Sequence, residues 1–188
     1  VYTFKFNADP SHMLAFRVLA GVGKGYGNSK ILPFEKLFWS GGAYSLRGWQ
    51  ARSLGPGSSP EDKSFVLPNQ TGDIKLEANI EYRFPLFWLL KGALFADAGN
   101  IWTFNRVIED VNGNYVKADE RGVFKFNNFY KNLALDWGAG LRLDITYVIL
   151  RLDVGLKTYN PATSSWVKPA RWLKDSNCQI SFGIGYPF

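Results

Sequence analysis

The chain has 188 residues, a length that suits one domain, and a formal net charge of +6. Its basic residues are scattered singly rather than in runs, so the charge alone does not indicate a nucleic-acid or anionic-lipid partner. Aromatic residues make up 16% of the sequence, with 19 glycines and 7 tryptophans. Aromatic side chains favour strands and glycine relieves close backbone contacts, so this composition points to β-structure.

The composition gives little support to metal sites or nucleophile sites. The single cysteine, Cys178, and the single histidine, His12, exclude a disulfide within the chain and argue against a Cys/His metal site. We therefore expect no cofactor and no metal. No run of 18 apolar residues occurs, which excludes a transmembrane helix but not transmembrane strands. The first ten residues alternate and carry charges, so we expect a removed leader or an internal fragment rather than a signal peptide.

Strict alternation of apolar and polar residues predicts strands along most of the chain. In residues 74–84, for example, six apolar side chains alternate with lysine, glutamate, asparagine and arginine. The last predicted strand alternates large apolar residues with serine, glycine and proline only. Seven strands are predicted, at 1–7, 15–27, 74–84, 88–104, 135–145, 148–156 and 180–188.

The predicted connections between these strands alternate in length. Short connections fall at 9–11, 85–87 and 145–147, and long ones at 28–71, 105–132 and 160–176. Tight turns on one rim and long loops on the other are typical of outer-membrane barrels.

The two faces of the predicted strands differ sharply in polarity. One face carries both charge signs and many glycines, as suits a wet lumen, while the other is apolar. Aromatic residues near the strand ends fit the girdles that lie at membrane interfaces: Tyr82, Phe84, Trp137, Tyr186 and Phe188. The pattern favours a membrane barrel, but a soluble lipocalin-like barrel with its apolar face inward stays open as an alternative.

Four stretches, in order along the chain, resemble one family. "GGAYSLRGW" at 41–49 resembles the signature of the sixth extracellular loop of BamA-type barrels, whose core is [V/I/L]-R-G-[F/Y/W]. "GDIKLEANIEYRFPL" at 72–86 and "ALFADAGNIW" at 93–102 resemble the two strands that follow this loop. "GIGYPF" at 183–188 is similar to the aromatic-ended closing strand. Together they resemble the BamA-type surface-antigen superfamily, and the loop sequence is most similar to that of BamA/TamA-like insertases.

The resemblance implies an all-β fold, an antiparallel transmembrane β-barrel of roughly sixteen strands in the bacterial outer membrane. Residues 1–188 would be its C-terminal part, with a long internal loop at 28–71. It implies no enzymatic activity, but the folding and insertion of β-barrel clients through an openable seam. One alternative is a two-partner secretion transporter that exports a single polypeptide; a second is the soluble ligand-binding barrel. The implied partners are unfolded outer-membrane protein clients, outer-membrane lipids and accessory lipoproteins, with no nucleic acid.

The resemblance also assigns roles within the loop. Arg47 would be held by Glu81 and Asp97, because a guanidinium with its fixed fork of donors can bridge two carboxylates. The other residues given a role are Gly41, Gly42 and Gly48, which would let the backbone turn tightly, and Trp49, which would pack against the wall. The alternative is a solvated arginine and two ordinary lumen carboxylates. The following stretch "SLGPGSSPED", 53–62, is expected to be a flexible, exposed flank.

The closing strand carries the last assignment. Gly183 and Gly185 weaken the strand, and with Tyr186 and Phe188 they would form a seam that pairs poorly with the first strand of the barrel. The alternative is that the glycines only relieve crowding in the lumen and that Phe188 is only a sorting signal. Asp97 and Glu81 lack a visible nucleophile–base partner, so no catalytic residue is expected.

Overall fold

The structure, a computed structural model, describes residues 2–6, 9–28, 31–60, 69–104, 107–109, 115–117, 119–145, 147–174 and 177–188. Its regular elements within these residues are β-strands and four short 3-10 helices, with no α-helix. The strands are β1 (Tyr2–Phe6), β2 (Asp9–Val22), β3 (Ile74–Phe87), β4 (Leu90–Trp102), β5 (Val107–Glu109), β6 (Tyr115–Lys117), β7 (Ala134–Ile145), β8 (Val148–Asn160), β9 (Ser165–Trp166) and β10 (Cys178–Ile184). The 3-10 helices are η1 (Phe34–Lys36), η2 (Glu120–Gly122), η3 (Phe129–Asn132) and η4 (Pro169–Arg171).

One antiparallel sheet contains eight of these strands. Its order is β1-β2-β3-β4-β7-β8-β10, and β9 pairs with the end of β8, while β5 and β6 form a separate hairpin. Each strand of the path therefore lies beside its predecessor, as in an up-and-down barrel. The predicted all-β antiparallel fold is confirmed, and the seven strands of the path are the seven that the alternation predicts. Among the described residues the sheet stays open, since no pairing joins β1 to β10.

Several predicted boundaries are wrong by a few residues. The β1–β2 connection lies before Asp9 rather than at 9–11, and β2 ends at Val22, where glycines take over from the apolar alternation. Residues 85–87 belong to β3, and the chain reverses at Trp88, which has a φ of 50°. Proline at 85 is tolerated there because a register shift between Pro85 and Phe87 interrupts the ladder.

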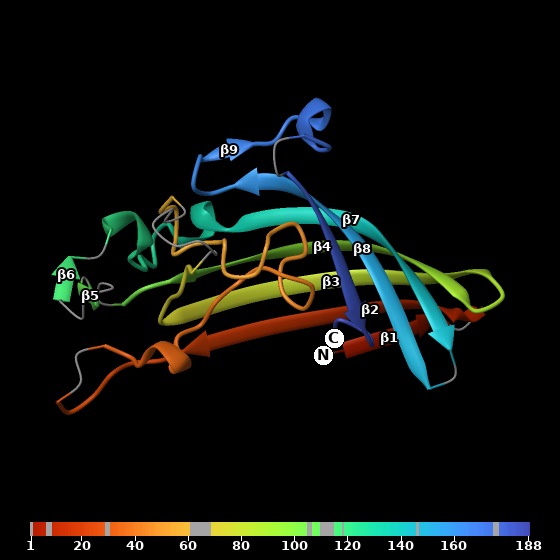
Figure 1. Ribbon diagram of the computed structural model, residues 1–188, viewed down its shortest axis with the longest axis horizontal. Helices are drawn as coiled ribbons and strands as arrows, with labels where there is room; N and C mark the ends of the chain where they lie inside the picture. The colour runs from red at the N-terminus through yellow and green to blue at the C-terminus, as the bar shows by residue number, and fades with distance from the viewer. Residues whose placement is uncertain are drawn as a thin grey trace.

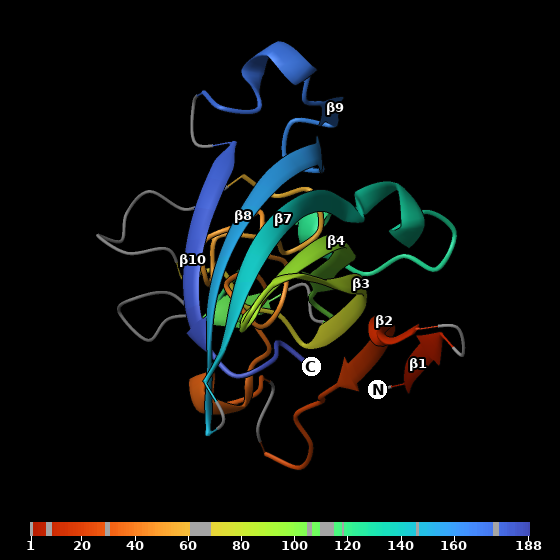
Figure 2. The ribbon, with the colours of Figure 1, turned by 90° about the vertical axis from the view of Figure 1, so that its right-hand side faces the viewer.

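The sheet is a curved trough with all of its long loops at one end (Figure 1). Seen end-on, the strands curl from β10 through β4 to β2, and the loop that follows β2 lies inside the curve (Figure 2). Strands of 13 or 14 residues, such as β2, β3 and β4, are long enough to cross a bilayer when tilted.

The two faces of this trough carry charged and apolar side chains on the sides opposite to those in a soluble protein. On the concave face charged side chains are buried, with Glu81 and Arg142 fully so. On the convex face large apolar side chains are exposed, among them Ile80 at 37% and Phe182 at 66%. A soluble protein rarely leaves so continuous an apolar face uncovered, so this face matches the lipid-facing surface of a membrane barrel.

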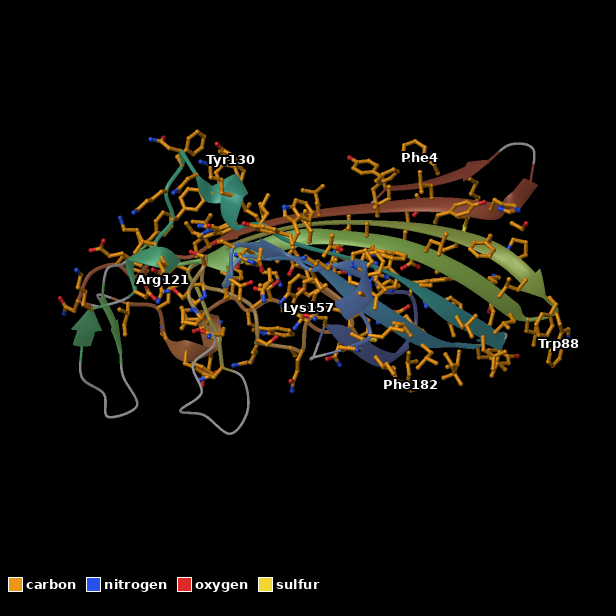
Figure 3. All side chains as sticks on the ribbon, turned by 90° about the horizontal axis from the view of Figure 1, so that it is seen from above. Phe4, Trp88, Arg121, Tyr130, Lys157 and Phe182 are labelled. Atoms are coloured by element: carbon orange, nitrogen blue, oxygen red, sulfur yellow. The ribbon has the colours of Figure 1, made fainter. Side chains whose placement is uncertain are left out.

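Aromatic side chains mark the turn end of the trough. Trp88 and Tyr147 sit at the tight turns and are 88% and 94% exposed. Figure 3 shows Trp88 at this end and Tyr130 at the loop end, with Phe4 and Phe182 directed outward between them. Rings at both levels fit the interfacial positions that aromatic residues favour. None of the described helical turns is long or apolar enough to cross a bilayer as a helix.

Candidate functional site

A short hairpin of residues 40–52, here called the Arg47 loop, occupies the concave face of the sheet. Gly41 and Gly42 have φ values of +94° and +89°, a left-handed conformation that non-glycine residues rarely adopt. The amide of Gly42 donates to the carbonyl of Trp49 over 2.7 Å, and the amide of Arg52 donates to the carbonyl of Ser40 over 3.0 Å. The two glycines therefore set the reversal that presents the intervening residues to the wall.

Arg47 lies where the loop meets the sheet, and it is buried, with 1% of its surface exposed. Its Nε and NH2 groups donate to the two carboxylate oxygens of Asp97, each over 2.8 Å, in a bidentate fork. Its NH1 group donates to Glu81, and its backbone amide donates to Asp97 over 3.2 Å. Burial acts to lower the pKa of the guanidinium, but the hydrogen bonds and charges of Asp97 and Glu81 outweigh it and raise the pKa. The structure thus brings together the three residues that the sequence motif connects.

The wall beneath Arg47 is a row of four register neighbours on four strands. Glu81 on β3 pairs with Phe95 on β4, Phe95 with Gly138 on β7, and Gly138 with Gly155 on β8. The Arg47 guanidinium lies over the Phe95 ring, 3.5 Å from its centroid. A Cβ atom at Gly155 would overlap the carbonyl of Arg47. This Glu81–Gly155 row therefore gives Arg47 a carboxylate partner and an aromatic ring. The absence of a side chain at Gly155 leaves room for the backbone of the loop.

The carboxylate of Glu81 is shared by three arginines. Besides Arg47, it accepts a hydrogen bond from Arg83 over 2.7 Å and one from Arg142 over 3.2 Å. Arg142 in turn donates to Asp153, 2.5 Å away on β8. All of these side chains are at most 5% exposed, so each charge is compensated within the network rather than by bulk water.

A second attachment holds the start of the loop. The hydroxyl of Ser40 donates to Glu77 over 2.7 Å, and Ser45 also donates to this carboxylate. Arg17 and Lys75 lie 3.2 and 3.0 Å from the same carboxylate. Asn79 of the same strand donates to the Ser45 carbonyl over 2.9 Å. The resemblance assigns no role to Glu77 and Asn79, although they lie on the same face of β3 as Glu81, four and two residues before it.

Trp49 packs between the loop and the wall, and Lys157 of β8 lies 5.6 Å from its ring centroid. Trp49 forms a small apolar cluster, buried to 3% exposure or less, with Leu46, Leu54 and Ala134. The adjoining Gly48 approaches β7 so closely that an added Cβ would lie 2.6 Å from the Cβ of Asp136. Both residues lie where the sequence analysis expected them, against the wall.

The expectation of an exposed flank at 53–62 is wrong for residues 53–59, which are buried or half-buried, while Pro60 is exposed as expected. Leu54, Gly55 and Ser59 are buried. The amide of Gly57 donates to the Ile101 carbonyl over 2.7 Å, and Asn100 donates to the Gly57 carbonyl over 2.8 Å. Glycine and serine often indicate a solvated loop, but here their small size lets the backbone lie directly on β4.

The predicted closing strand is shorter than expected. β10 ends at Ile184, and Gly185 has a φ of +83°, so the chain turns at this point. Tyr186 and Phe188 consequently leave the outer face, and the prediction that they join the lipid-facing girdle is wrong. The ring of Tyr186 lies 4.1 Å from the Arg83 guanidinium, which also donates to the Phe188 carbonyl over 3.2 Å.

Gly183 and the loop both contact the end of the sheet. Gly183 pairs with Arg151 of β8, and a Cβ on it would lie 2.6 Å from the Arg151 Nε atom. Glycine at this position leaves room for the Arg151 guanidinium, which agrees with the alternative that the glycines relieve crowding on the concave face. The hydroxyl of Tyr44 in the Arg47 loop donates to the Ile184 carbonyl over 2.7 Å. The loop thus connects the middle of the sheet to the last residue of its last strand.

Within the described part of the chain, no three His, Cys, Asp or Glu side chains are arranged to hold a metal ion. The arrangement connects strands: the Arg47 loop is fixed to β3 and β4 by charged hydrogen bonds and contacts β10. Sequence reasoning missed Phe95, Arg142, Asp153 and Gly155. A signal for the glycine was available, because Gly138 and Gly155 lie on the polar track of two neighbouring strands, where small residues indicate a close approach of backbone.

Comparison with known proteins agrees with the motifs. The model of the Omp85 superfamily domain matches residues 1–188. The outer membrane protein assembly factor BamA of Neisseria meningitidis serogroup B is 27% identical over 117 residues. This alignment covers 60% of the present chain and 14% of the length of that relative.

Proposed function

Because this chain belongs to the Omp85 superfamily, we propose that it is the C-terminal part of an outer-membrane assembly factor that folds and inserts β-barrel clients. The chain resides in the bacterial outer membrane, so the soluble lipocalin-like alternative is wrong. The alignment with a BamA favours assembly over export of a single polypeptide. In this proposal the region 28–71 is the internal loop of a larger barrel, and unfolded outer-membrane proteins are its clients.

The observation that carries the proposal is the contact between the Arg47 loop and the end of β10. Tyr44 holds the Ile184 carbonyl, while Arg47 fixes the same loop to β3 and β4. β10 has 7 residues against 13 in its neighbour β8, and it pairs with β8 only from Leu156 to Leu150. A short last strand that is held from inside is suited to controlled opening.

The mechanism follows from the cost of a free strand edge in lipid. Backbone amides and carbonyls that lack partners cost several kcal/mol each in hydrocarbon. A client strand that pairs with the free edge of β10 satisfies those groups and its own, as in strand addition to other sheet edges. The Arg47 loop keeps the rest of the wall in register while the edge exchanges partners. In this mechanism the protein needs no cofactor, forms no covalent intermediate and is not an enzyme.

Depletion of the full-length protein, followed by quantitative proteomics of the outer membrane, tests the proposal. Rescue is attempted with wild type, Arg47→Ala, Arg47→Lys and the control Arg52→Ala. Arg52 belongs to the same loop but is only half-buried, and its side chain donates a long hydrogen bond of 3.3 Å to Asn69. Its guanidinium also lies over the rings of Phe34 and Trp39, which belong to the loop region and not to the sheet. We expect many unrelated barrels to fall together and to be restored by wild type and Arg52→Ala only. Lysine should not replace Arg47, because a point charge cannot form the bidentate fork.

Two outcomes would contradict the proposal. Loss of one secreted protein with all other barrels intact would make the chain part of a two-partner secretion transporter. An unchanged outer membrane would remove any role in assembly. Equal rescue by Arg47→Ala and wild type would leave the assembly function in place but remove the loop from its mechanism.

A further inference from the structure

The convex face of the sheet carries a groove that the assembly function does not use. It has a volume of about 440 Å³ and crosses β2, β3, β4 and β7 in the half nearest the loops. Its floor is formed by small side chains, because Ala78 pairs with Ala98 and the next position of the floor is Ala96. Its walls include Phe16 on one side and Trp137 on the other.

The position of this groove points to an apolar chain as its occupant. It opens on the lipid-facing surface, where an unfilled depression would lose dispersion contacts on its lining. Its volume lies within the range of about 300–1,000 Å³ that small-molecule sites occupy. Because the wall residues are large and the floor residues small, an acyl chain lying in the groove would contact protein on three sides.

Two chain segments rich in basic residues adjoin the loop end of this groove. The ring of Trp172 packs on Trp137 at 5.2 Å between centroids, which brings the segment after η4 to the groove wall. Arg171 precedes this tryptophan, and η3, with Lys131, leads directly into β7. The flanking segments 124–133 and 161–174 contain no acidic residue and five basic ones: Lys125, Lys131, Lys168, Arg171 and Lys174. All five are exposed.

We propose that this groove binds an acyl chain of a phosphorylated glycolipid, of the lipid A class, with its phosphate held by the basic residues above. The loop end of an outer-membrane barrel faces the cell exterior, where an outer-leaflet lipid would present its headgroup at the level of Arg171 and Lys174. A phosphomonoester carries a charge of about −1.5 to −2 near neutral pH and three acceptor oxygens, which suits several cationic donors. This inference depends on the outer-membrane location and not on the proposed assembly function.

Native mass spectrometry of the full-length protein in a non-ionic detergent tests this inference. The probes are lipid A, phosphatidylglycerol and phosphatidylethanolamine. Ala96→Phe with Ala98→Phe fills the groove, and Ala139→Phe adds the same ring to the convex face outside it. Arg171→Glu with Lys174→Glu reverses the charge above the groove. Lys36→Glu with Lys117→Glu is the control, since these exposed lysines lie outside the two basic segments.

We expect lipid A to bind at least tenfold more tightly than phosphatidylethanolamine, and each test pair to weaken it at least fivefold. Both control variants, and Ala96→Ser, which keeps the groove open, should bind as wild type does. Heat-modifiable migration on gels shows that every variant is folded. If lipid A binds the groove-filled variant as tightly as it binds wild type, the groove is not the site. If phosphatidylglycerol binds wild type as tightly as lipid A does, the preference for a glycolipid is wrong. If wild type forms a dimer that the groove-filled variant does not form, the occupant of the groove is a second copy of the chain.

Discussion

The guanidinium of Arg47 lies over the face of Phe95, with 3.5 Å between its central carbon and the ring centroid. Both side chains are buried, at 1% and 4% exposure. The ring therefore supports the cation from below while Glu81 and Asp97 hold its edges. A desolvated cation–π contact of this kind contributes about 2 kcal/mol.

We expect Phe95→Leu to destabilise the folded protein by about 1–3 kcal/mol, because it removes both the ring face and part of the buried volume. Phe95→Tyr keeps the aromatic ring under Arg47, so it should lose little of the stability that this contact contributes. The urea midpoint of the full-length protein in detergent measures the difference. A loss for Phe95→Leu that persists unchanged in an Arg47→Ala background would show that the ring acts by packing alone.

The same residue types form a buried pair and an exposed pair in this chain, which allows a direct comparison. Arg47 with Asp97 is buried, whereas Arg121 with Asp119 is 58% and 36% exposed at a similar distance. We expect double-mutant cycles to give a coupling energy of about 3–5 kcal/mol for the buried pair and a far smaller one for the exposed pair, which water screens. Coupling energies of equal size would contradict the buried clamp.

Gly155→Val should displace the Arg47 loop without changing any of its charges. The new side chain would overlap the Arg47 carbonyl, and the backbone of β8 cannot retreat because it is paired on both sides. A cysteine at Ser45, in a Cys178→Ser background, should then react with a membrane-impermeant maleimide at least tenfold faster than in the parent. Ala139→Val, on the convex face of β7, is the control and should leave the rate unchanged. A slow, unchanged rate for Gly155→Val would mean that the wall deforms instead.

Gly185→Val should prevent the chain end from turning inward. A β-branched residue at a φ of +83° costs roughly 1–2 kcal/mol or more, so an extended continuation of β10 becomes favoured. Tyr186 and Phe188 would lose their contacts with Arg83. We expect faster removal of the last residues by carboxypeptidase, whereas Ile184→Val should behave as wild type. Protection equal to wild type would show that the tail is held by its side chains alone.

Sequence alone predicts most of the wall. Alternation with period two over 11 residues predicts both the existence and the facing of β3 and β7, because a slip by one residue would exchange the two faces. It also predicts that Arg47 meets Glu81 and Asp97, through the motif rather than through the pattern. The strand ends were less predictable, since they depend on local turns such as that at Trp88.

The errors share a physical cause. Small residues have the same sequence signature whether they are solvated or pressed against backbone. The stretch 54–59 belongs to the second class, and only its position on β4 reveals it. The inward turn after Ile184 was missed for a related reason, because alternation continues in the sequence after pairing has stopped.

The Glu81–Gly155 row draws one residue from each of four strands, and this has a consequence for the order of folding. A one-residue slip in any of the three pairings would turn a member of the row outward and leave the loop without its support. Arg47 can therefore be desolvated only after β3, β4, β7 and β8 have paired correctly. Docking of the loop therefore stabilises only the correct strand register. In a refolding experiment its amides should gain protection from hydrogen exchange after those of the four strands, and earlier protection would refute this order.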